Sequence, residues 1–251
     1  MAESTVIQGT EAIFTNGNSI GILICHGFNG TPQSVSYLAE GFAKYGFTVY
    51  APQLKGHGTT ILEMEQATYQ DWISNLHEAY LLLKQTCRYV FVIGQSMGGA
   101  LALDLATTEA LTGVLTINAA LSVPEYEAFG HKLEPRFIAE GKPDIKDTEA
   151  TEITYDQVPL KAVLQLLDLM KATKQHLSKV TCPIKIFVSP EDHVVPAGCS
   201  YNIFDTVHST EKELVSLENS YHVASLDYDK DKIIKHTVDF IKIHIEEATV
   251  A

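Results

Sequence analysis

The chain has 251 residues, 45% of them hydrophobic and 20% charged, a composition that indicates one folded domain, or one domain with an insertion, and excludes a disordered chain. Its 31 acidic and 18 basic side chains give a net charge of −13, which repels phosphate backbones, so we expect no nucleic acid partner. The four cysteines form no Cys-x-x-Cys pair and have no histidine at zinc-ligand spacing, so we expect no metal site, no redox motif and no cofactor.

The N-terminal region carries no targeting or membrane signal. No lysine or arginine occurs before Lys44, and the opening MAESTVIQGT lacks the apolar core of a secretory signal. The apolar run GILIC, at residues 21–25, is too short to cross about 30 Å of hydrocarbon. We therefore expect a cytoplasmic protein without an integral membrane segment.

From residue 21 onward, short apolar runs rich in β-branched residues alternate with longer segments of helical periodicity. This order is typical of parallel strands joined by crossover helices, so we predict an α/β fold. The expected strands are residues 21–25, 47–51, 89–93, 113–118, 184–189 and 213–217. The expected helices are residues 34–45, 69–86, 97–110 and 230–247, the last of which should pack on the sheet through Ile233, Ile234, Val238, Ile241 and Ile245.

Residues 121–178 interrupt this alternation. They contain no convincing strand, and charged and turn residues are concentrated in residues 140–152. We predict a cap inserted between two strands, with residues 1–120 and 179–251 forming the core. Leu160, Val163, Leu164, Leu167 and Met170 share one helical face of the insertion, which indicates either core packing or a pocket for an apolar chain. On the second interpretation, Leu164 and Leu167 are candidate substrate contacts.

The segment Gly94-Gln95-Ser96-Met97-Gly98 lies between a predicted strand and a predicted helix. The pattern G-x-S-x-G alone is a modest signal, and its plain alternative is a turn without catalytic meaning. A strand before it and a helix after it are what a nucleophile elbow requires, because the serine must sit on a tight, strained turn. We therefore predict Ser96 as a nucleophile.

A serine nucleophile needs a base and an acid that orients the base. The chain has ten histidines, but an elbow of this kind predicts the order serine, acid, histidine, with the last two placed after later strands. Asp192 follows the strand 184–189 and His222 follows the strand 213–217. Glu191 remains a rival acid, whereas His193, His208, His236 and His244 are expected on the surface or in packing.

The same mechanism needs two backbone N–H groups that face the oxyanion of the reacting carbonyl. One is expected from Met97, directly after the nucleophile, and the other from Phe28 in the glycine-flanked loop His26-Gly27-Phe28-Asn29-Gly30. Histidines in that loop and in Lys55-Gly56-His57-Gly58 are expected to be structural.

The motifs HGFNG, YAPQLKGHG, GQSMGG, PEDHVVP and NSYHVASLDYD occur in that order, and with them the chain resembles the α/β-hydrolase superfamily. More narrowly, residues from about 20 to 245 resemble the bacterial carboxylesterase and monoacylglycerol lipase group. The resemblance implies an α/β-hydrolase fold with a small cap, and hydrolysis of monoacylglycerol to fatty acid and glycerol by Ser96, Asp192 and His222. It also implies that Glu152 contacts the glycerol end. Gln95 departs from the leucine common in related enzymes.

Three functions are compatible with these residues. The leading hypothesis is a serine hydrolase for neutral lipid esters, because a charge of −13 disfavours anionic substrates. The alternatives are a short-chain or aryl carboxylesterase, and a ligand-binding protein with the same fold and little turnover. The sequence does not predict the oligomeric state.

Overall fold

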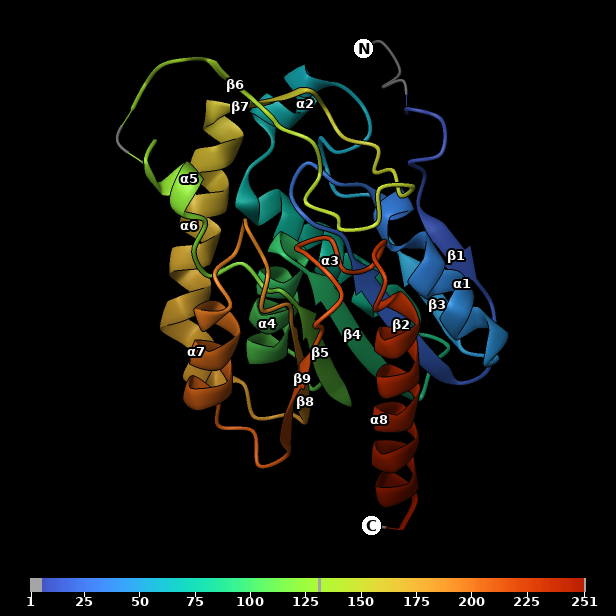
Figure 1. Cartoon of the computed structure of the whole chain (residues 1–251). Helices are drawn as coiled ribbons and strands as arrows, with labels where there is room; N and C mark the ends of the chain where they lie inside the picture. The colour runs from blue at the N-terminus through green and yellow to red at the C-terminus, as the bar shows by residue number, and fades with distance from the viewer. Residues whose placement is uncertain (1–5, 131, 251) are drawn as a thin grey trace.

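A seven-stranded sheet forms the centre of the computed structural model, which describes residues 6–130 and 132–250 (Figure 1). The strand order is β1-β3-β2-β4-β5-β8-β9, and all neighbouring pairs are parallel except β1 with β3. The strands are β1 (Ile13–Thr15), β2 (Ile20–Cys25), β3 (Thr48–Ala51), β4 (Tyr89–Gln95), β5 (Gly113–Ile117), β8 (Ile184–Val188) and β9 (Lys212–Ser216).

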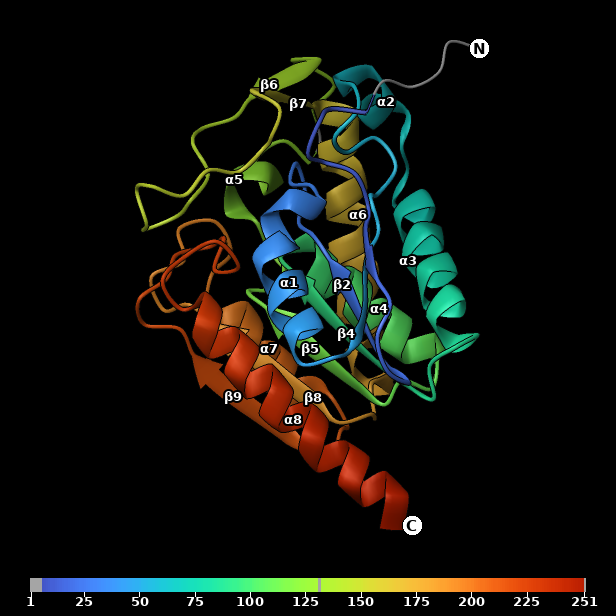
Figure 2. The same cartoon turned by 90° about the vertical axis from the view of Figure 1, so that its right-hand side faces the viewer.

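Helices cover both faces of this sheet (Figures 1 and 2). One face carries α1 (Ser36–Lys44) and α8 (Lys230–Val250), and the other carries α3 (Tyr69–Lys84), α4 (Met97–Thr108), α6 (Leu160–His176) and α7 (Gly198–Thr206). Shorter helical segments are η1 (Pro32–Val35), α2 (Ile61–Gln66), α5 (Pro124–Glu127) and η2 (Leu177–Lys179). No helix in the two described ranges is long and apolar enough to cross a lipid bilayer.

The alternation of side chains along β4 explains why the sheet is covered on both faces. Val90 and Val92 are buried in the cluster formed with α3 and α4, whereas Phe91 and Ile93 are buried in the cluster formed with α1 and α8. Successive side chains of a strand point to opposite faces, so a strand buried on both sides is a continuous apolar run. This is the pattern from which the strand was predicted.

The predicted α/β fold, its six strands and its four helices are confirmed, with boundaries that differ by a few residues. The expectation that residues 121–178 contain no strand is wrong, because β6 (Phe137–Ala139) and β7 (Gln157–Pro159) form an antiparallel pair. Three-residue strands are too short to produce a recognisable alternation. The same reason explains why β1 was not predicted.

The segment between β5 and β8, which we predicted to be an inserted cap and call the cap below, has two parts. The segment from α5 to β7 lies over the carboxyl ends of the strands, as Figure 1 shows. Ser96 follows one of these strands, β4, and His222 follows another, β9. Helix α6 instead runs along the sheet, where Leu166, Leu169 and Met170 belong to the same buried cluster as α4. The side chains of Ile233, Ile234, Val238 and Ile241 on α8 are buried against the other face of the sheet.

Candidate active site

Ser96 lies on a tight turn between β4 and α4, with φ 56° and ψ −119°. Positive φ is unfavourable for a residue with a side chain, so the surrounding backbone must hold this conformation. Glycine is required on both sides: a Cβ atom at Gly94 would overlap the carbonyl of Gly98, and one at Gly98 would overlap the carbonyls of Cys25 and His26. The turn therefore has the strained geometry of a nucleophile elbow.

His222 connects Ser96 to Asp192. Its Nε2 lies 2.9 Å from Ser96 Oγ and its Nδ1 lies 2.7 Å from Asp192 Oδ2. The other oxygen of Asp192 accepts the backbone N–H groups of Val194 and Val195, each at 2.8 Å, which fixes the carboxylate. Ser96, Asp192 and His222 therefore form the continuous chain that a serine, histidine and aspartate triad requires.

The electrostatics around His222 favour a charged imidazolium. Burial lowers the pKa of His222, but the negative charge of Asp192 and its hydrogen bond raise it, and more distant charges of Asp144 and Glu152 act in the same direction. The balance places this pKa above its usual value. An imidazole stabilised in its protonated form suits a base that must take the proton of a serine hydroxyl.

Glu191, the rival acid, and four other histidines, His193, His208, His236 and His244, take no part in this chain of contacts. Glu191 points to solvent and pairs with Lys146, with Oε2 2.8 Å from Nζ. His193 bonds Asp144, and His208 is exposed. On α8, His236 is partly exposed and His244 bonds the carbonyl of Phe240.

The loop after β2 passes directly beside Ser96. A Cβ atom at Gly27 would lie 3.3 Å from that of Ser96, so only glycine allows this approach without displacement. Phe28 follows in the same loop and lines the cavity with Ser96. Met97 begins α4, where the first N–H groups of a helix have no partner within it. The two predicted oxyanion donors thus belong to segments that meet at Ser96.

His26 fixes the conformation of this loop through hydrogen bonds of its imidazole ring. Its Nδ1 lies 2.9 Å from the carbonyl of Gly27, and its Nε2 accepts the N–H of Leu54 at 3.3 Å. This pairing requires a neutral ring, with Nδ1 as donor and Nε2 as acceptor. Burial lowers the pKa of His26 to about 4.

Two amide side chains that sequence reasoning missed join the same loop to the cap. Asn29 donates to the carbonyl of Tyr155 and accepts its N–H, both at 3.0 Å. Gln33 donates to the carbonyl of Thr151 at 2.9 Å and accepts the N–H of Ile153 at 3.0 Å. Each amide thus donates one hydrogen bond to the cap backbone and accepts one from it, as the backbone of a neighbouring β-strand would. The sequence feature that could have indicated these contacts is the presence of an Asn and a Gln, both able to pair with backbone groups, in HGFNGTPQ at residues 26–33.

The segment held by these amides carries Glu152. Its Oε1 would lie 2.8 Å from a Cβ atom at Gly30, and its side chain lines the cavity that contains Ser96. Burial raises the pKa of Glu152 to about 7, although the positive charge of His222 and the hydroxyl of Ser34 oppose the rise. Glu152 therefore changes between a neutral acid and a carboxylate near neutral pH.

The cavity above Ser96 has a volume of about 170 Å³. Its apolar lining includes Phe28, Val123, Tyr126, Leu166 and Val194. The two cap residues predicted from the sequence, Leu164 and Leu167, do not line it. Adjacent residues of a helix differ by about 100° in direction, so Leu166 faces the cavity while Leu167 packs against the neighbouring core.

Two further buried side chains, Gln95 and Asn118, join the segments that carry Ser96, Asp192 and His222, and of these the sequence analysis missed Asn118. Gln95 accepts the N–H of Ser225 at 3.0 Å, which joins the nucleophile elbow to the segment after His222. Asn118, at the end of β5, donates to the carbonyl of His222 at 2.9 Å and accepts the N–H of Ser189 at 2.7 Å. Among the described residues no cluster of three or more His, Cys, Asp or Glu side chains is arranged to hold a metal ion.

Comparisons with known proteins agree with this geometry. Residues 19–229 match the family model Hydrolase_4, described as serine aminopeptidase, S33. The chain is 45% identical over 242 residues to a thermostable monoacylglycerol lipase of Bacillus sp. (strain H-257), covering 95% of this chain and 97% of that protein. It is 25% identical over 234 residues to a carboxylesterase of Bacillus subtilis (strain 168), covering 90% and 94%.

The solved structures show the same relationship. One structure, from a study of LipS and LipT, two metagenome-derived lipolytic enzymes, matches with a TM-score of 0.93 and 41% identity, covering 96% of this chain and 100% of that chain. The resemblance predicted from the sequence motifs is therefore confirmed. The chain belongs to the Hydrolase_4 family, serine aminopeptidase S33, within the α/β-hydrolase superfamily.

Proposed function

We propose that this protein hydrolyses carboxylic esters of neutral lipids, with monoacylglycerol as the substrate class. The observation that carries the proposal is the continuous contact from Ser96 through His222 to Asp192, beside a cavity lined by both apolar side chains and Glu152. The 45% identity to a monoacylglycerol lipase over nearly the whole chain supports the substrate class. The net charge of −13 further favours a neutral substrate.

In the proposed mechanism, Ser96 Oγ attacks the ester carbonyl while His222 Nε2 takes its proton. Asp192 keeps the imidazole in the tautomer that presents Nε2 to the serine and stabilises the imidazolium. The N–H groups of Phe28 and Met97 bind the oxyanion, aided by the N-terminus of α4. His222 then gives its proton to the leaving alcohol, and the acyl group remains on Ser96. Water, activated by His222, releases the fatty acid and restores the serine.

Glu152 has a separate role in this proposal. A partly buried carboxyl in the cavity offers hydrogen-bond acceptors to the two free hydroxyls of the glycerol end. Because Gln33 holds the backbone on both sides of Glu152, the carboxyl group does not need to be ordered when substrate binds. Esters of simple alcohols offer no such hydroxyl. This contact would distinguish glycerol esters from other esters.

The test is a panel of monoacylglycerols, the matching ethyl esters, and 4-nitrophenyl esters with acyl chains of increasing length. We expect the highest kcat/KM on monoacylglycerols of medium or long chain. A preference for acetate or aryl esters would instead support the carboxylesterase alternative, which the relative from Bacillus subtilis favours. No turnover of any ester, or turnover that survives in the Ser96→Ala variant, would refute the proposal.

A further inference from the structure

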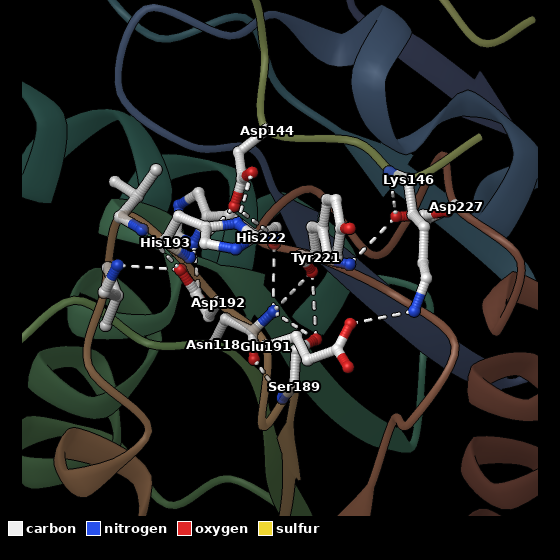
Figure 3. Close-up of polar contacts among 12 residues, drawn as sticks. Asn118, Asp144, Lys146, Ser189, Glu191, Asp192, His193, Tyr221, His222 and Asp227 are labelled. Atoms are coloured by element: carbon white, nitrogen blue, oxygen red, sulfur yellow. Dashed lines mark hydrogen bonds and ion pairs between the residues drawn. The ribbon is translucent and has the colours of Figure 1, made fainter. Parts of the chain in front are cut away.

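The cap contributes a short segment, residues 144–147, that lies across the loops carrying Asp192 and His222 (Figure 3). We call this segment the cap strap. Two carboxylates, one in the cap strap and one in the core, bond the cap strap to the core. Asp144 of the cap strap accepts hydrogen bonds from the backbone beneath it, while Asp227 of the core accepts the N–H groups of Lys146 at 2.7 Å and Asp147 at 3.0 Å.

Asp144 bonds both of the loops that carry the base and the acid. Its Oδ2 accepts the N–H of His193, the residue after Asp192, and the N–H of His222 itself, each at 3.1 Å. Its Oδ1 lies 2.8 Å from His193 Nδ1, and its own carbonyl accepts the N–H of Val223 at 3.1 Å. One carboxylate oxygen thus fixes the spacing between the two loops.

The backbone of His222 is consequently held at both of its polar groups. Its N–H donates to Asp144 from the cap, and its carbonyl accepts from Asn118 at the end of β5, as Figure 3 shows. Asn118 directly follows β5 of the central sheet, and its backbone N–H bonds the carbonyl of Phe187 in β8. Asp144 belongs to the cap strap, so the hydrogen bond from the N–H of His222 to Asp144 exists only when the cap strap is in contact with the core.

We propose that Asp144 is a positioning residue: its carboxylate aligns the histidine with the acid, so the triad is fully assembled only when the cap strap is in place. This inference rests on the proposed triad. It assigns to the cap a part in arranging the catalytic groups, in addition to enclosing the substrate. Asp144 acts through backbone hydrogen bonds, and no proton passes through it.

The charge of Asp144 gives this role a measurable signature. Among the described residues, the charges that act most strongly on His222 are those of Asp192, Asp144 and Glu152, and each of them favours the protonated imidazole. Removing the charge of Asp144 therefore lowers the pKa of His222. Because the neutral ring is the base, the acidic limb of the pH profile of kcat/KM should move to lower pH.

The experiment compares Asp144→Ala and Asp144→Asn with the wild type on a chromogenic ester. We expect kcat to fall by about 100-fold in Asp144→Ala, as is typical for a small displacement of catalytic groups, with KM little changed. Asp144→Asn keeps one oxygen acceptor and should recover part of kcat. It should nevertheless show the shifted acidic limb, because it lacks the charge.

The matched control is Asp147→Asn, in the same strap, whose carboxylate accepts the N–H of Glu149 and lies 3.9 Å from Lys230 Nζ at the start of α8. It accepts neither of the backbone N–H groups that Asp144 bonds. We expect its kcat and its pH profile to be those of the wild type. A second control, His193→Ala, removes the ring partner of Asp144 and keeps both backbone bonds, so it should retain most of kcat. If His193→Ala reproduces the loss seen in Asp144→Ala, the side-chain pair and not the backbone alignment is responsible, and the proposal fails.

Melting temperatures of all variants identify any that fail to fold, in which case Asp144→Asn alone decides the matter. A wild-type kcat and an unshifted acidic limb in folded Asp144→Asn would overturn the inference. The proposed function is tested separately, because full activity in Ser96→Ala or His222→Ala would refute the triad itself. Inactive triad variants combined with fully active Asp144 variants would refute only the role of Asp144.

Discussion

Replacing Glu152 by glutamine should make the protein more stable at alkaline pH while weakening its recognition of glycerol esters. The change keeps the size and shape of the side chain and removes its ionisation. In the folded protein the pKa of Glu152 is raised from 4.5 to about 7 by burial. The folded state therefore holds its proton more tightly than the unfolded chain does, and stability decreases as pH rises from about 4.5 to about 7.

The size of this effect follows from the shift. A rise from 4.5 to about 7 corresponds to about 3 kcal/mol at pH 8, and water reaching the cavity reduces this to a range of ~1–3 kcal/mol. Glu152→Gln avoids this cost, so its melting temperature at pH 8 should exceed that of the wild type by ~3–10 °C. At pH 5, where Glu152 is largely protonated, the two proteins should have similar stability.

Urea unfolding of both proteins at pH 5 and pH 8 measures the stability difference directly. Glu149→Gln, an exposed position in the same acidic run, serves as the control and should show no pH-dependent difference. In kinetics, loss of a contact worth ~1–3 kcal/mol should raise KM for a monoacylglycerol by about 5- to 150-fold, and leave KM for the matching ethyl ester unaffected. A stability difference that is the same at both pH values would refute the argument from burial, and an unchanged ratio of kcat/KM between the two esters would refute the role in substrate binding.

Three further predictions concern the catalytic groups and the cavity. Ser96→Ala should lower kcat by about 10⁵- to 10⁶-fold without changing the melting temperature by more than a few degrees, as a chromogenic ester assay and a thermal melt can establish. Asp192→Asn should lower kcat by about 10⁴-fold and Glu191→Gln by less than about twofold, and the reverse order would show that the acid has been misassigned. Leu166→Ala should reduce kcat/KM for long-chain esters several-fold relative to acetate esters, because each buried CH₂ contributes ~0.8 kcal/mol, whereas Leu164→Ala should affect both alike; equal effects on the two esters in Leu166→Ala would show that this side chain does not contact the acyl chain.

The sequence predicted the fold, and it singled out the three residues that the structure brings into contact, because both depend on local patterns. A strand buried on both faces must be apolar throughout, as β4 is, and a nucleophile elbow must have small residues beside the serine. Asp192 and His222 were selected by chain order relative to two strands. The structure brings them to Ser96 because the carboxyl ends of parallel strands share one edge of the sheet.

The contacts that orient these residues were not predictable in the same way. Asn29, Gln33 and Asn118 act through backbone atoms of segments that are more than 60 residues away in the chain, and no local pattern records such a partner. The pocket-facing side of α6 was also misjudged. Its apolar residues divide between the cavity and two packed clusters, so periodicity identifies the helix and does not say which neighbour each side chain meets.

The pairing of Asn29 and Gln33 with the cap uses only backbone atoms on the cap side, namely those of Thr151, Ile153 and Tyr155. Every amino acid except proline offers the same N–H and carbonyl groups. Side chains at positions 151–154 can therefore be exchanged in evolution or in a mutant library without removing the bonds that seat this segment. If Glu152 binds the alcohol end of the substrate as proposed, a new alcohol can be accommodated by a change at position 152, with the backbone of the segment still held by Asn29 and Gln33.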